Sequence, residues 1–174
     1  MGKIANKSGG GAQTNINGLL FEQTTSLDDA LREAGFIISE NHVYDPKANL
    51  VGLSLPKYDL YKTLLKIHGI DYRDKISKRY LPDDSFLNIS TNVLYIIEKK
   101  FQSQSGSVDE KLATFPFKRY VYERLVDGLN LQIKYLYVLS DWFNKPRYSD
   151  YYDYMKENEC DYFFNEIPLD FLGL

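Results

Sequence analysis

One stretch of the sequence, residues 93–102, limits what this chain can fold into more than any other. It reads VLYIIEKKFQ. Val, Ile, Tyr and Phe crowd into one short run, which is typical of a buried β-strand. The apolar run ends abruptly at Glu98, Lys99 and Lys100. The chain is therefore predicted to build a sheet whose core ends where these three charged side chains begin.

Other segments indicate that helices flank this sheet. Apolar residues at helical spacing, or a polar Tyr-rich composition, mark four helical segments: residues 15–35, 55–70, 107–128 and 145–159. Runs rich in β-branched and aromatic residues mark further strands: residues 36–40, 42–45, 86–89, 131–140 and one beginning near position 160. This order predicts an α/β fold with a central mixed β-sheet flanked by helices.

Three details qualify the helical segments. The Thr-Thr-Ser centre of the first allows two short helices in place of one, with Gly35 as the stop. Ser107 and Glu110 form a capping-box pattern at the start of the third helix. Pro116 is expected to break or restart that helix, since proline lacks a backbone N–H.

Length, charge and cysteine content narrow the class of protein. The 174 residues predict a flexible N-terminal arm, residues 1–15, and a single domain, residues 16–174. The net charge of −3 argues against binding nucleic acid by bulk positive charge, but it does not exclude a nuclease. The lone cysteine, the lack of an apolar secretory segment and the lack of a membrane-spanning apolar run predict a cytoplasmic protein that binds no membrane.

The end of the 93–102 strand can carry chemistry. Side chains alternate faces along a strand, so Glu98 and Lys100 share a face. An antiparallel partner carrying Asp83 would set a second carboxylate beside Glu98. Converging carboxylates repel each other unless a cation joins them, and oxygen ligands favour Mg²⁺. With Lys100 holding an attacking water, this set could hydrolyse a phosphodiester. The alternative is a solvated hairpin with an ordinary salt bridge, and Asp84 competes with Asp83 for the metal role.

The same residues resemble a known signature. Pro82-Asp83 followed by Glu98-Lys99-Lys100 resembles that of the PD-(D/E)xK nucleases, which include many type II restriction endonucleases. The flanking FQSQSGSVDEK and both chain ends are similar to one restriction-enzyme branch. The resemblance implies a restriction-endonuclease-like core, Mg²⁺ as cofactor, and metal binding by Asp83, Glu98 and the backbone carbonyl of Lys99.

The resemblance also implies roles for other residues. Lys100 would be the catalytic lysine, Glu22 an acidic residue supplied by the first helix, and Gln102 a glutamine that follows the catalytic lysine. Six basic residues stand beside aromatic ones and are candidates for contacts with DNA. Lys78, Arg79, Lys118 and Arg119 are candidates for phosphate contacts, and Lys145 and Arg147 for base contacts. For any one of these six, a plain solvated surface is the competing interpretation.

The resulting expectation is a Mg²⁺-dependent type II restriction endonuclease that hydrolyses double-stranded DNA as a homodimer. One alternative is the catalytic, nicking subunit of a heteromeric enzyme with a separate recognition subunit. A structure-selective nuclease, such as a junction resolvase, is another. A non-catalytic DNA-binding protein is the most remote.

Overall fold

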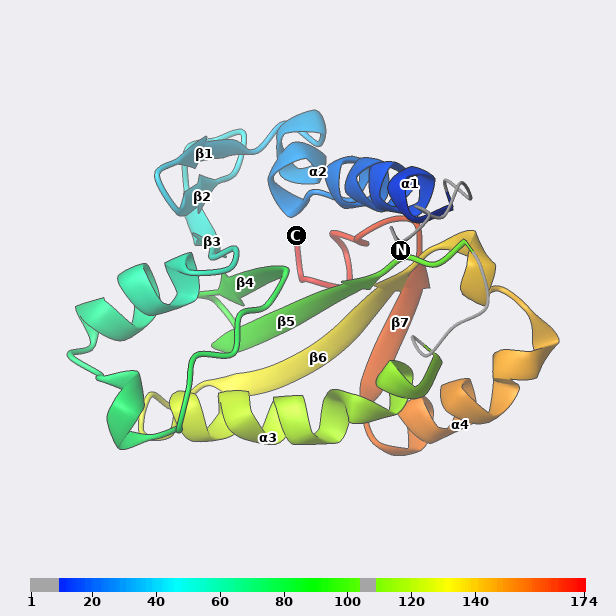
Figure 1. Ribbon diagram of the computed structural model, residues 1–174. Coiled ribbons are helices and arrows are strands. Elements are labelled where there is room, and N and C mark those ends of the chain that lie inside the picture. The colour runs from blue at the N-terminus through cyan, green and yellow to red at the C-terminus, as the bar shows by residue number, and fades with distance from the viewer. Residues whose placement is uncertain (1–9, 104–108) are drawn as a thin grey trace, which may run out of the picture.

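The computed structural model describes residues 10–103 and 109–174 and shows an α/β protein with a seven-stranded mixed sheet (Figure 1). The strands lie side by side in chain order. Neighbours from β1 to β5 are antiparallel, whereas β5, β6 and β7 are parallel. The bounds are β1 Ile37–Ser39, β2 His42–Tyr44, β3 Leu50–Ser54, β4 Asp84–Asn88, β5 Val93–Lys100, β6 Gln132–Leu139 and β7 Cys160–Phe164.

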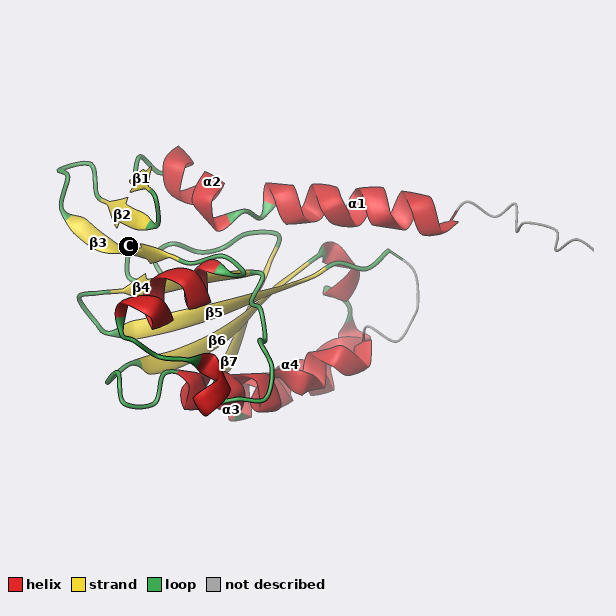
Figure 2. Ribbon diagram, turned by 60° about the vertical axis from the view of Figure 1, so that its left-hand side comes forward, coloured by secondary structure: helices red, strands yellow, loops and turns green. Residues whose placement is uncertain are grey.

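Helices cover both faces of this sheet. The α-helices of the described residues are α1 Gly10–Thr24, α2 Leu27–Glu33, α3 Phe115–Leu125 and α4 Ser149–Glu157. Helices α1 and α2 lie over one face, and α3 and α4 lie over the other (Figure 2). In the described residues, one π-helix, Leu60–Leu65, and four 3-10 helices complete the secondary structure. The 3-10 helices are Tyr72–Asp74, Asp109–Thr114, Asp141–Phe143 and Pro146–Tyr148. Within the described residues, no helix has the length and apolar character needed to cross a bilayer.

Strand β5 separates two hydrophobic clusters. Leu94 and Ile96 belong to the cluster under α3 and α4, together with Tyr135 of β6. Tyr95 and Ile97 belong to the cluster under α1 and α2. The alternation expected from the sequence is confirmed. It places Glu98 and Lys100 on the α3 side of the sheet and Lys99 on the α2 side.

The N-terminal helical region is two helices, as its Thr-Thr-Ser centre allowed. The Ser26 side chain accepts a hydrogen bond from the backbone N–H of Asp29 and caps α2. Gly35 follows with φ +89°, a left-handed conformation suited to glycine. Helix α1 begins at Gly10, so residues 10–15, which were assigned to the predicted arm, are helical. Residues 1–9 of that arm, and the predicted cap at Ser107, lie outside the described residues.

The structure differs from the sequence predictions at two further places. Strand β3 was not predicted. The segment predicted as a helix over residues 55–70 is a π-helix at its centre, with Leu60 and Leu64 buried as expected but Ile67 67% exposed. Pro116 lies in the first turn of α3, where its missing N–H costs nothing, so it restarts the helix.

Candidate metal and catalytic site

Asp83, directly before β4, and Glu98 of β5 are neighbours at one end of the β4–β5 ladder. Asp84 pairs with Ile97, so continuing the antiparallel register by one residue sets Asp83 opposite Glu98. The backbone N–H of Lys99 donates to Oδ2 of Asp83 at 2.7 Å and holds this carboxylate in place. Burial raises the pKa of Asp83, and the negative charge of Glu98 raises it further. The two acidic groups therefore converge, as the sequence predicted.

Two lysines share the Glu98 carboxylate, which is only 5% exposed. Lys100 Nζ lies 2.9 Å from Oε2, and Lys118 Nζ, from α3, lies 2.7 Å from Oε1. Lys100 Nζ also donates to the backbone carbonyl of Lys99 at 3.2 Å. Each oxygen of Glu98 thus carries one ammonium group, which compensates the cost of burying its charge.

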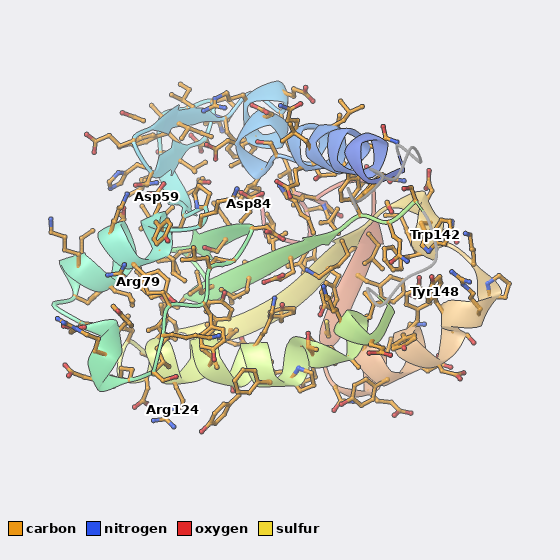
Figure 3. The ribbon with its side chains drawn as sticks, in the orientation of Figure 1. Asp59, Arg79, Asp84, Arg124, Trp142 and Tyr148 are labelled. Carbon is orange, nitrogen blue, oxygen red and sulfur yellow. The ribbon has the colours of Figure 1, made fainter. Side chains whose placement is uncertain are left out.

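Asp84 lies on the opposite face of the sheet and serves the fold. Its Oδ2 lies 2.6 Å from Lys99 Nζ, and both side chains are nearly buried. The backbone N–H of Leu27 donates to the same oxygen at 3.4 Å, so Asp84 links the sheet to α2 (Figure 3). Because it points away from Glu98, Asp84 cannot replace Asp83 beside Glu98.

Glu22 and Gln102, the other two residues that the resemblance implies, lie at the margins of this site. Glu22, near the end of α1, is exposed, but its charge is close enough to contribute to the raised pKa of Asp83. Its backbone carbonyl accepts from Lys99 Nζ at 3.5 Å. Gln102 is buried just beyond β5, and its backbone N–H donates to Ser140 Oγ at 3.3 Å. Glu22 is thus placed to act through charge, and Gln102 to anchor the end of β5.

The donor set suits a magnesium ion better than a zinc ion. Nowhere in residues 10–103 and 109–174 do three His, Cys, Asp or Glu side chains group closely enough to hold a metal. Zinc sites in proteins need three or four such ligands. Mg²⁺ is commonly bound by one or two carboxylates, with waters and substrate phosphates supplying the rest. Asp83, Glu98 and the Lys99 carbonyl fit that pattern once an ammonium group leaves Glu98.

The sequence placed Lys118 among possible DNA contacts and missed its pairing with Glu98. A signal for this pairing is present, because Lys118 precedes the buried residues Val121, Tyr122 and Leu125 at spacings of three, four and seven. This spacing puts Lys118 on the sheet-facing side of α3. A lysine on the buried face of a helix needs an acidic partner.

Replacing Lys118 with Gln should therefore tighten divalent-ion binding in the absence of DNA. The substitution removes a cation that competes for Glu98, and we expect the affinity for Mg²⁺ or Ca²⁺ to rise about twofold to fivefold, as for an ion pair worth about 0.5–1 kcal/mol. Isothermal titration calorimetry measures this directly. Lys111→Gln, at an exposed position before α3, is the matched control. Unchanged or weaker metal affinity in Lys118→Gln would show that Lys118 does not compete.

The remaining predicted DNA contacts have diverse surroundings. Arg119 is paired with Glu123 at 2.8 Å and with Glu159 at 3.0 Å, so its charge is already compensated. Lys145 lies 3.5 Å from the centre of the Trp142 ring, which Arg147 also approaches. The two other residues stack on tyrosines: Lys78 on Tyr80 and Arg79 on Tyr72.

Comparison of the chain with protein-family models, curated proteins and solved structures found no match. The case for a function therefore depends on the signature residues and their placement.

Proposed function

We propose that this chain is a Mg²⁺-dependent DNA endonuclease of the type II restriction kind, with a core of the PD-(D/E)xK type. The observation that carries the proposal is the convergence of Asp83, Glu98 and Lys100 at one end of the β4–β5 ladder. An ordinary surface hairpin does not explain it. Glu98 is buried, and the raised pKa of Asp83 marks a carboxylate placed where its charge is costly.

Each residue has a separate role in the proposed reaction. Asp83, Glu98 and the Lys99 carbonyl would hold Mg²⁺, which when bound supplies Lewis-acid stabilisation of the phosphate charge. Lys100 would position the attacking water through its ammonium group. The water oxygen forms a bond to phosphorus, the bond from phosphorus to the 3′ oxygen breaks, and that oxygen takes up a proton. The products are a 5′-phosphate and a 3′-hydroxyl.

One such site cuts one strand. Cleavage of both strands requires two sites, so we propose that the enzyme acts as a homodimer on a palindromic sequence, or as the nicking subunit beside a recognition subunit. These two arrangements share the same chemistry and differ in the product that they leave on a plasmid.

Supercoiled plasmid incubated with the protein and Mg²⁺ tests the proposal. The homodimer predicts a linear product whose ends map to a defined sequence, and EDTA should abolish it. An open-circular product alone would support the nicking subunit. Cleavage confined to branched DNA would instead favour a junction-resolving nuclease. If plasmid and branched DNA both stay intact with Mg²⁺ and with Mn²⁺, this chain is not a nuclease on its own.

A further inference from the structure

A groove away from the β4–β5 site has a positive charge of its own. It measures about 570 Å³ and lies between the π-helix and the turn at residues 69–73. Its charged lining consists of four basic side chains and one carboxylate: Lys62, Lys66, Arg73, Arg79 and Asp71. The groove therefore carries a net charge of +3, whereas the whole chain carries −3. Such segregation of charge attracts a polyanion.

Three of these positive charges are available to a ligand. Asp71 and Arg73 pair with each other at 2.5 Å and compensate each other. Lys62 and Lys66 are exposed and have no ion pair among the described residues. Arg79 stacks on the Tyr72 ring at 4.6 Å, which orients its guanidinium without neutralising it.

Aromatic rings accompany the positive charges. Tyr58 is 47% exposed at the groove, and Lys62 Nζ lies 5.8 Å from the centre of its ring. Tyr61 and Tyr72 line the wall. These rings orient the cations through cation–π contacts and leave the positive charges open to a phosphate backbone. An acidic peptide could use the same charges, and the position of the groove beside the candidate site favours a DNA strand.

A second groove continues this surface toward α3. Arg73 also lines this groove, of about 420 Å³, whose other lining includes Lys75, Arg124 and the exposed rings of Phe117 and Tyr120. Phe117 directly precedes Lys118, the residue that contacts Glu98. Arg79 and Arg124 lie at the same end of the molecule, opposite to Trp142 (Figure 3).

The first groove is within reach of the candidate site. Arg79 precedes Asp83 by four residues, and four residues span at most about 14 Å. The segment between them is fixed, because the Tyr61 and Tyr122 hydroxyls both donate to the backbone carbonyl of Tyr80, at 2.7 and 3.2 Å. A duplex strand advances about 3.4 Å per nucleotide along its axis, so Arg79, at the edge of the groove, lies within about four nucleotides of a phosphate at Asp83.

We propose that this groove binds the phosphate backbone of a DNA strand beside the bond to be cut, through Lys62, Lys66 and Arg79. The position relative to the cut rests on the proposed nuclease function. The binding itself does not, because it can be measured without cleavage.

The test measures duplex binding by the full chain in EDTA. Fluorescence anisotropy of a labelled duplex gives Kd at several salt concentrations. Lys62→Gln with Lys66→Gln should weaken binding at least tenfold at low salt. The slope of log Kd against log salt should fall by about 1.8, since each lost phosphate contact removes about 0.9. Lys66→Gln alone should remove about half of that slope change. Both lysines are exposed, so circular dichroism should show an unchanged fold.

The control removes the same charge elsewhere. Lys47→Gln with Lys156→Gln changes two exposed lysines that line neither groove, and it should keep the wild-type slope. If the control loses as much duplex affinity as the groove variant, the effect is due to net charge and the proposal is overturned. The proposal is also overturned if the groove variant binds duplex as tightly as the wild-type protein, or if the wild-type protein binds a mononucleotide but no duplex.

The outcomes separate the groove from the nuclease proposal. If the wild-type protein binds duplex through the groove but cuts no DNA with Mg²⁺, the groove is supported and the nuclease function fails. If the wild-type protein cuts DNA and the double groove variant binds and cuts equally well, the nuclease stands and the groove proposal fails.

Discussion

Replacing Lys100 with Met should lower the rate of Mg²⁺-dependent DNA cleavage by about three orders of magnitude. Met keeps most of the length of the side chain but removes the ammonium group, which lies 2.9 Å from Glu98 Oε2. The variant would lose the group that positions water and offsets charge in the transition state. Single-turnover cleavage of a plasmid, with protein in excess over DNA, reports this step without product release.

The same variant should bind duplex within a few-fold of the wild-type protein, because Lys100 is not one of the groove lysines. Anisotropy in Ca²⁺ or EDTA measures that binding. Lys100→Arg keeps the positive charge with a different shape and should retain more activity than Lys100→Met. Cleavage by Lys100→Met within tenfold of wild type would remove Lys100 from the mechanism.

The sequence was most informative where a period of two residues governs the side chains. Alternation along β5 correctly separated Glu98 and Lys100 from Lys99, because both faces of that strand are buried and the register cannot slip without burying the wrong residues. The choice between Asp83 and Asp84 followed from the Pro-Asp spacing. The structure gives the physical reason, since adjacent residues of an extended chain point to opposite faces.

The missed elements have local reasons. Strand β3 contains Gly52, a poor strand former, yet no other residue fits there. A Cβ at Gly52 would lie 2.4 Å from the backbone oxygen of Leu87 and equally close to the Phe86 ring. The π-helix at 60–65 shifts the side-chain phase, so Ile67 left the buried face that a 3.6-residue period predicted.

The contacts of Lys118 depend on tertiary packing. Lys118 and Glu98 are far apart in the sequence and meet only when α3 packs on the sheet. The sequence therefore indicated the acidic and basic groups of the β4–β5 site but not which cation balances each carboxylate. The basic groove also could not be predicted from the sequence, because Lys62 and Arg79 come from separate segments that only the fold brings together.

Replacing Asp84 with Ala should lower the free energy of unfolding by about 3–5 kcal/mol, the usual cost of leaving one member of a buried ion pair alone. Lys99 and Asp84 have side chains only 7% and 11% exposed, and their charged atoms lie 2.6 Å apart. The variant leaves the Lys99 ammonium without its partner and removes the acceptor for the Leu27 N–H. Urea unfolding followed by circular dichroism gives the value.

The pair can also be replaced as a unit. Asp84→Leu with Lys99→Met removes both charges and retains apolar volume, so we expect a free energy of unfolding within about 2 kcal/mol of wild type, with much of the deficit due to the lost Leu27 hydrogen bond. The double variant should then be more stable than Asp84→Ala. This comparison tests whether Asp84 stabilises the fold and takes no part in metal binding. If Asp84→Ala is as stable as wild type but fails to bind Mg²⁺, then Asp84, and not Asp83, is the metal ligand.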